Sequence, residues 1–203
     1  MAKQTFKRAS QLSPEERRQQ LLRCALGVFA RNGLGRGNHA MVAKEAGVAV
    51  PTVFSYFPNR EALVDAVLEE IEIQLLDIVN HERQRTDLTA YQKLLNLLTN
   101  YADFIDQEPD LIKIFLGWNA SFEDDLAKKY QAYLKKVITL LIEIVVDGQE
   151  KQEFGAEVDP EEAALIVYGS ANVIAQIKFS NYDTDITHYL VSLLNSTLRL
   201  SEN

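Results

Sequence analysis

The sequence predicts an all-α protein of about nine helices. Apolar residues recur at spacings of three and four along most of the chain, which is typical of amphipathic helices, and no alternating pattern lasts long enough to predict a strand. Capping residues precede several of these segments, and glycine or proline follows them. Apolar residues make up 47% and charged residues 25% of the 203 positions, which is typical of a globular protein with a substantial core.

The first sixty residues predict three short helices. Ser13-Pro14-Glu15-Glu16 is a capping box with proline at the first helical position, and the helix that it opens ends at Gly33. A second helix, over about 38–46, ends at Gly47, and a third covers about 50–57. Two short helices joined by a tight glycine turn are typical of a helix-turn-helix.

Six further helices are expected in the rest of the chain. Asn59 caps a long one, whose apolar face continues to Ile78. The others cover about 91–105, 109–118, 130–144 with Gly148 as its end, 160–177 opened by Asp159, and 186–198. We divide the chain into a helix-turn-helix DNA-binding domain with a basic arm, residues 1–60, and a helical ligand-binding and dimerisation domain, residues 61–203.

The charge is distributed unevenly between these two parts. Residues 1–60 contain ten Lys and Arg against three acids, a net charge of +7. Residues 61–203 contain eleven Lys and Arg against twenty-six acids, a net charge of −15. This asymmetry indicates a polyanion-binding end, whereas the overall charge of −8 argues against indiscriminate coating of nucleic acid.

Several classes of protein are disfavoured. The single cysteine, Cys24, excludes an internal disulfide and fits a reducing compartment. The longest stretch without Asp, Glu, Lys or Arg is residues 163–177, fifteen positions, short of the roughly 20 that a membrane helix needs. The polar, basic start does not resemble a signal peptide. From these observations we expect a cytoplasmic, nucleoid-associated protein. No Ser/His/Asp set, metal cluster or acid pair can be placed together, so we expect that it is not an enzyme and has no cofactor.

The third helix is the predicted recognition element, which enters the major groove of double-stranded DNA. Thr52, Ser55 and Tyr56 supply hydroxyls to the groove, whereas Val53 and Phe57 face inward. The basic residues and the start of the second helix add contacts to phosphate. The predicted DNA-binding residues are Lys7, Arg8, Arg36, Asn38, His39, Lys44, Pro51, Thr52, Phe54, Ser55, Tyr56 and Arg60.

Three features of this region have more than one interpretation. Phe54 fits either the groove-facing or the inward side of its helix. His39, at the start of the second helix, either contacts a phosphate or caps and packs. The glycine-rich stretch 33–37 follows a helix and lacks the Lys-Ser/Thr of a nucleotide loop, so it is a helix connection rather than a phosphate cradle.

A family resemblance begins at Arg23. From there to Leu68 the chain reads RCALGVFARNGLGRGNHAMVAKEAGVAVPTVFSYFPNREALVDAVL, which is similar to the amino-terminal domain of the TetR family of transcriptional regulators. Within the chain, GLGRGNHA, TVFSYFPNREALVD and FLGWNAS resemble the LuxR/HapR branch, the quorum-sensing master regulators of vibrios. The resemblance implies a homodimer that binds a pseudo-palindromic operator and represses or activates transcription. The alternative is a ligand-released repressor of a neighbouring operon without a quorum-sensing role.

The chain departs from this branch at several positions. Ala9 and Gln11 stand where the branch has arginines in its amino-terminal arm, and Ser55 stands where it often has asparagine. Asparagine makes a bidentate contact to adenine that serine cannot make, so we expect a different operator sequence. Leu134 and Ala171 replace an asparagine and a cysteine of the branch's ligand cavity, which makes the expected cavity more apolar.

The resemblance also implies a ligand cavity and a four-helix dimer contact in the second domain. Aromatic residues there either line the cavity or fill the core. The expected lining is Leu75, Phe115, Trp118, Asn119, Leu134 and Ala171, and its lack of charge predicts an apolar small-molecule effector. The expected dimer interface is Tyr168, Ala171, Ile174, Ile186, Leu190, Leu193 and Leu194.

Overall fold

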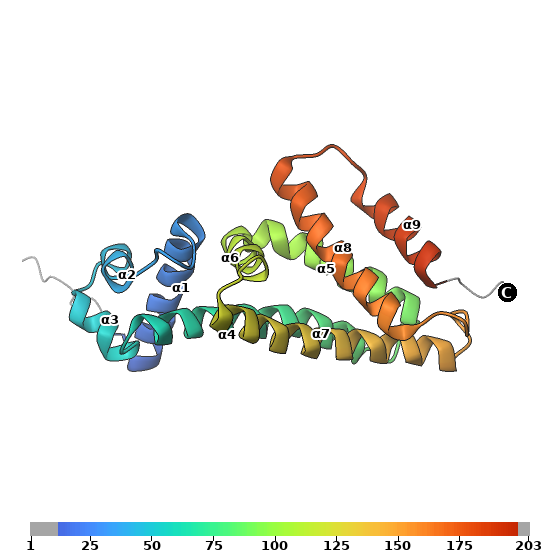
Figure 1. Ribbon diagram of the computed structural model, residues 1–203, viewed down its shortest axis with the longest axis horizontal. Helices are drawn as coiled ribbons and strands as arrows, with labels where there is room; N and C mark the ends of the chain where they lie inside the picture. The colour runs from blue at the N-terminus through green and yellow to red at the C-terminus, as the bar shows by residue number, and fades with distance from the viewer. Residues whose placement is uncertain (1–11, 199–203) are drawn as a thin grey trace, which may run out of the picture. The chain divides into compact units, whose positions relative to one another are not determined.

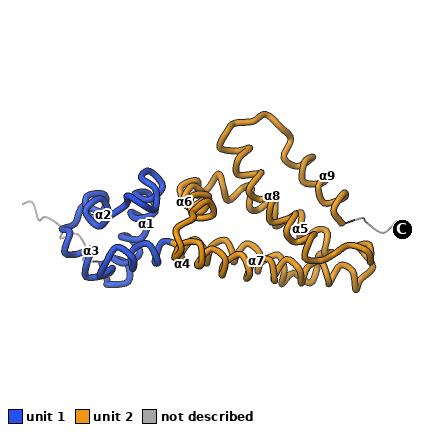
Figure 2. The backbone as a smooth tube through the Cα atoms, in the orientation of Figure 1, with its two compact units in different colours: residues 1–67 blue, residues 68–203 orange. Residues whose placement is uncertain are grey.

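The computed structural model of the protein describes residues 12–198, and within this range it contains nine α-helices and no strand (Figure 1). The predicted all-α class is confirmed. The chain forms two compact units, which divide between Val67 and Leu68 (Figure 2). The sequence placed the boundary at residue 60, where the charge changes, whereas the first two turns of the fourth helix belong to the first unit.

Unit 1 contains three complete helices and the start of a fourth: α1 (Pro14–Asn32), α2 (His39–Ala46), α3 (Val50–Tyr56) and α4 (Arg60–Arg83). The predicted capping box is present at α1. The Ser13 hydroxyl oxygen accepts the Glu16 N–H at 3.2 Å, and the Glu16 carboxylate accepts the Ser13 N–H at 2.8 Å. At α4 the Asn59 side chain accepts the Ala62 N–H at 2.7 Å, which confirms the predicted cap.

The turn between α2 and α3 depends on Gly47. Its φ of +66° lies in the left-handed region, where a side chain would be strained, and its N–H bonds back to the last turn of α2. Beyond the turn, α3 places Val53 and Phe57 in the core of unit 1, as the sequence predicted. The buried residues around them are Leu21, Leu22, Ala25, Phe29, Val42 and Leu63.

Unit 2 contains the rest of α4 and five further helices: α5 (Ala90–Gln107), α6 (Pro109–Asn119), α7 (Asp124–Glu150), α8 (Pro160–Ser180) and α9 (Ile186–Leu198). In this unit α5, α7 and α8 pack against one another, and α9 contacts α5 and α8 (Figure 1). Asp159 caps α8 as predicted, because its carboxylate accepts the N–H groups of Glu161 and Glu162, both at 2.9 Å. Along residues 12–198, no helix has both the length and the apolar content that crossing a membrane requires.

Gly148 does not end α7, and the prediction at this residue is wrong. The helix continues to Glu150, and Gly148 is buried within it. A Cβ added at this position would lie 2.3 Å from the Phe154 ring and 2.8 Å from the Ala90 side chain. Glycine is therefore needed here for close packing, not for a turn.

Candidate DNA-binding surface and ligand cavity

Five predicted DNA contacts lie together on α3. Pro51, Phe54 and Ser55 are exposed, and Thr52 and Tyr56 are half-buried. The Ser55 hydroxyl donates to the Thr52 carbonyl oxygen at 2.7 Å, so its proton is already engaged. Its oxygen still has lone pairs that can accept a hydrogen bond from a base amino group.

His39 is buried beneath this surface. Its side chain is 5% exposed, and its Nε2 lies 2.7 Å from the carbonyl oxygen of Phe57. Since a carbonyl oxygen only accepts, Nε2 carries the hydrogen. The imidazole also stacks on the Phe54 ring. This position fits the packing interpretation of His39 better than the expected phosphate contact.

Phe54 lies between the two positions that the sequence left open. One face of its ring packs on His39, with the centroids 4.0 Å apart, yet the residue remains 46% exposed. A large apolar side chain held in place at the surface of a short helix can contact a thymine methyl group or a sugar. We therefore keep Phe54 among the candidate contacts.

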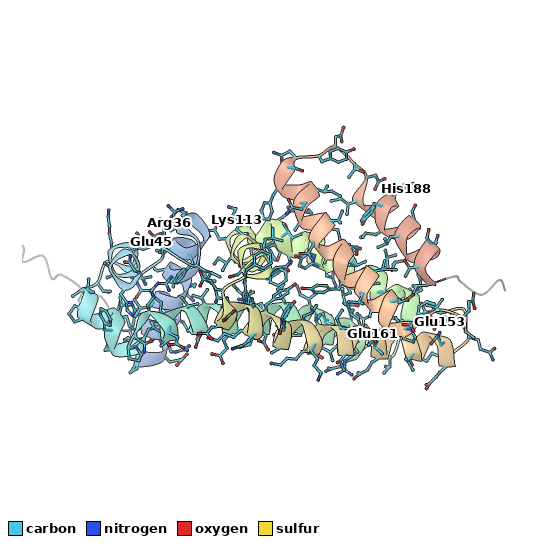
Figure 3. The ribbon with its side chains drawn as sticks, in the orientation of Figure 1. Arg36, Glu45, Lys113, Glu153, Glu161 and His188 are labelled. Atoms are coloured by element: carbon cyan, nitrogen blue, oxygen red, sulfur yellow. The ribbon has the colours of Figure 1, made fainter. Side chains whose placement is uncertain are left out.

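The connection between α1 and α2 presents the other candidate contacts. Arg36, which is labelled in Figure 3, and Lys44 are both exposed. Their side chains have no ion pair or hydrogen bond within residues 12–198. Asn38 caps α2 instead, because its side chain accepts the Met41 N–H at 3.2 Å and donates to the Arg36 carbonyl oxygen at 3.3 Å. The two cations are therefore available to phosphate, whereas Asn38 positions the loop between them.

Arg60 is exposed, but its guanidinium is already occupied in part. Its Nε donates to the Gly37 carbonyl oxygen at 3.2 Å, and a terminal nitrogen donates to the Leu34 carbonyl oxygen. Arg60 therefore ties the start of α4 to the connection between α1 and α2. A guanidinium has five N–H groups, so the remaining ones can still reach a phosphate. The predicted contacts Lys7 and Arg8 lie outside the described residues.

Unit 2 contains a cavity of about 40 Å³ among α4, α5, α6, α7 and α8. Leu75, Phe115 and Ala171 line it, as expected. Leu134, Trp118 and Asn119 do not line it, which corrects half of the predicted set. Leu134 is half-buried away from the cavity because the Tyr133 side chain, on the adjacent residue of α7, takes the inward position.

Trp118 and Asn119 support the cavity wall from behind. The Trp118 indole N–H donates to the Leu126 carbonyl oxygen at 2.9 Å, which joins α6 to α7. Its ring packs against Tyr130 and Tyr133, with centroids 5.7 and 5.8 Å apart. The Asn119 side chain donates at 3.0 Å to the carboxamide oxygen of Asn172, which does line the cavity.

The cavity is less apolar than the sequence indicated, because tyrosine side chains contribute to its wall. Tyr101, Tyr133 and Tyr168 all line it. The Tyr168 hydroxyl lies 2.6 Å from the Tyr130 hydroxyl, within the same unit, and Tyr168 is half-buried. Burial raises the pKa of Tyr101, Tyr133 and Tyr168, and the phenols are therefore uncharged.

Three of the seven predicted dimer residues are internal to unit 2. Ile174 is 0% exposed, and Leu190 and Leu194 are also buried within the single chain, so these side chains are not available to a partner. Ile186, Leu193 and Ala171 are half-buried. The exposed large apolar residues of α8 are instead Leu165, Ile166, Val173 and, near its carboxyl end, Phe179. The sequence missed them because apolar residues occur on every side of this helix.

The comparisons with known proteins match both units. Residues 21–67 match the family described as bacterial regulatory proteins, tetR family, and residues 87–176 match the tetracyclin repressor-like C-terminal domain. The HTH-type transcriptional regulator LuxR of Vibrio harveyi is 30% identical over 187 residues, which cover 92% of this chain and 91% of that protein. The chain belongs to the TetR family. It is a DNA-binding transcriptional regulator, and the family's members are not enzymes.

Other members of the TetR family are similar along most of the chain. BetI of Vibrio atlanticus is 30% identical over 165 residues, 79% of this chain and 78% of that protein. The solved structure of Salmonella enterica GusR has a TM-score of 0.77 at 21% identity, covering 94% of this chain and 100% of GusR. FadR from Bacillus subtilis, solved in complex with stearoyl-CoA, has a TM-score of 0.73 at 21% identity, covering 89% and 97%. These two structures have the same fold.

Proposed function

We propose that this TetR-family protein is a homodimeric regulator of the LuxR/HapR type, which binds a pseudo-palindromic operator and takes part in quorum sensing. The observation that supports the branch best is the similarity to LuxR of Vibrio harveyi over nearly the whole of both chains. The alternative is a stand-alone repressor of a neighbouring operon, which a ligand releases from its operator.

The operator contacts follow from the surface of unit 1. The exposed side of α3 enters the major groove, where Thr52, Ser55 and Tyr56 meet base edges or flanking phosphates. Arg36 and Lys44 contact phosphates, because neither cation is engaged by another residue of the described chain. These contacts position the protein, while the residues of α3 provide the sequence specificity.

The dimer interface is the exposed apolar face of α8. Leu165, Gly169 and Val173 follow one another at a spacing of four, so they share one side of the helix, and Ile166 lies beside them. Leu165, Ile166 and Val173 are each more than two-fifths exposed, and Gly169 lets a second backbone approach closely. A two-fold contact between two copies covers the same patch on both and places two recognition helices on one operator.

The cavity provides control by a small neutral effector. Helix α4 contributes Leu63 and Val67 to the core of unit 1 and Leu75 to the cavity of unit 2 without interruption. A ligand that binds better to one conformation of this helix changes the affinity of the protein for DNA. By linkage, bound DNA changes the affinity for the ligand by the same factor. We propose that the effector weakens operator binding.

Selection of bound fragments from genomic DNA tests this function. A dimeric regulator should enrich one sequence with two half-sites, their centres about one helical turn, roughly 34 Å, or a multiple of it apart. Fragments without a common sequence would refute a specific operator. Target genes whose expression follows cell density support the quorum-sensing role, whereas a single operator beside a neighbouring operon supports the alternative.

A further inference from the structure

The cavity of unit 2 contains a hydroxyl without a partner. Tyr101 lines the cavity and is 6% exposed, and its hydroxyl oxygen makes no hydrogen bond to any of residues 12–198. Buried hydroxyls almost always have a partner, because an unsatisfied one destabilises the folded state. The neighbouring Tyr130 and Tyr168 hydroxyls bond to each other at 2.6 Å, whereas the Tyr101 hydroxyl has no partner among residues 12–198.

Two hydrogen-bond donors at this cavity have no acceptor among residues 12–198. A neutral tyrosine hydroxyl offers one proton, and the one on Tyr101 has no acceptor. The Asn172 carboxamide oxygen already accepts from Asn119 at 3.0 Å, which leaves the Asn172 NH₂ group as a second donor. A molecule that fits this arrangement must bring an acceptor.

The remaining wall restricts the ligand further. The other lining residues are aliphatic or aromatic, such as Leu75, Val137 and Phe115, and no Asp, Glu, Lys, Arg or His lines the cavity. A charged ligand would lose its hydration without gaining an opposite charge, which is strongly unfavourable. The volume of about 40 Å³ is smaller than the roughly 150 Å³ that holds benzene, so a ligand of that size must push the lining helices apart.

We propose that the cavity binds an uncharged, largely apolar molecule with one hydrogen-bond acceptor, such as a ketone or ester carbonyl, and that the Tyr101 hydroxyl donates the bond that selects it. This inference rests on the proposed function, since the molecule is the effector of the same cavity. Because the ligand enlarges the cavity, it favours the conformation in which α4 has moved. Tyr101 therefore determines which ligands are selected, and the helix responds to their size.

Two probes of nearly the same shape separate the hydrogen bond from apolar burial. Acetophenone has a carbonyl oxygen where α-methylstyrene has a CH₂ group. Calorimetric titration of the full-length protein should give about tenfold tighter binding of acetophenone, the ratio expected for one buried hydrogen bond. In Tyr101→Phe the preference should fall to about twofold or less, with the affinity for α-methylstyrene retained.

Tyr91→Phe is the matched control, because its hydroxyl bonds to the Asn195 side chain at 3.0 Å and does not line the cavity. This variant should keep the tenfold preference. Equal preference in the wild-type protein and Tyr101→Phe, or no binding of either probe at millimolar concentration, would overturn the inference.

The thermal midpoint of the ligand-free protein provides a second measurement. Tyr101→Phe should raise it, because the substitution removes an unsatisfied buried group. A lowered midpoint would show that a water molecule satisfies the hydroxyl, and the inference would then fail. If neither probe binds as expected but the protein still binds its operator, only this inference is overturned. If the wild-type protein selects no DNA sequence, the proposed function is overturned.

Discussion

The imidazole of His39 lies flat on the ring of Phe54, with the centroids 4.0 Å apart and the planes inclined by 6°. The same imidazole bonds to the Phe57 carbonyl oxygen, at the end of α3. The first residue of α2 therefore holds the exposed ring and the carboxyl end of the recognition helix together. The orientation of α3 depends on this buried side chain.

Replacing His39 separates a positioning role from a phosphate contact. His39→Ala should lower the free energy of unfolding by about 2–3 kcal/mol, because it removes a buried hydrogen bond and a ring contact. Operator affinity should fall, but the slope of log affinity against log salt should not change. A slope reduced by about two ions per dimer would instead show that His39 contacts a phosphate.

Arg36 and Arg31 form a matched pair for measuring phosphate contacts. Both are exposed on unit 1, but Arg31 is paired with Glu45 at 2.7 Å, whereas Arg36 has no partner within residues 12–198. Arg36→Ala should weaken binding to all sequences and flatten the salt slope by about two ions per dimer. Arg31→Ala should change the slope less, and equal slopes for all three proteins would contradict an Arg36 contact.

Ser55 is proposed to read one base of each half-site. Its hydroxyl proton is held by the Thr52 carbonyl oxygen, so it can only accept from DNA in this conformation. Ser55→Asn should shift the selected consensus towards adenine at one position of each half-site, because asparagine contacts adenine with two hydrogen bonds. Ser55→Ala, which provides neither group, should show no such shift. An identical consensus for Ser55→Asn and the wild-type protein would show that residue 55 does not read a base.

Neighbouring residues of α8 test the dimer interface. Val173 is 43% exposed, whereas Ile174 is 0% exposed. Val173→Asp should give folded monomers that lose specific DNA binding, because a charge is placed in the two-fold contact. Ile174→Asp should unfold the protein instead, since the charge would be buried in the core. Size-exclusion chromatography with circular dichroism distinguishes these outcomes, and a Val173→Asp dimer would refute the interface.

Alkaline pH should destabilise the protein through its buried tyrosines. The pKa values of Tyr101, Tyr133 and Tyr168 are raised in the folded state, mainly by burial, from the ordinary value of 10.0. Above about pH 10 the unfolded chain loses these protons while the folded chain retains them. The stability present below pH 10 should therefore fall as the pH rises, by up to about 1.4 kcal/mol per pH unit for each tyrosine.

Urea unfolding between pH 8 and pH 11 measures this decrease. Tyr101→Phe should make it shallower, because one titrating group is removed, whereas Tyr101 itself should not ionise in the folded protein at pH 11. An unchanged slope in this variant would contradict the role of burial at Tyr101.

The sequence predicted best the features that depend on neighbouring residues. The caps at Ser13 and Asp159 involve groups within three positions of each other, and the turn at Gly47 depends on its own backbone conformation. Gly148 was misinterpreted because its close contacts come from Phe154 and Ala90, and the contact with Ala90 depends on tertiary packing.

The site was predictable only in part for the same reason. In α8 the adjacent residues Val173 and Ile174 are both apolar, and only the packing against α5 and α7 decides which one faces inward. The hydroxyl pair of Tyr130 and Tyr168 joins residues 38 positions apart, so no local pattern indicates a polar group in the cavity. The burial of His39 likewise depends on the Phe57 carbonyl oxygen, which is distant in sequence.

Trp118 gives the molecule a single optical reporter. It is the one tryptophan among the 203 residues, it is 1% exposed, and its ring lies against Tyr130 and against Tyr133, which lines the cavity. Emission excited selectively at tryptophan therefore originates from one place. A helix displacement around the cavity would be visible as a spectral change in the unlabelled protein, in real time and without DNA present.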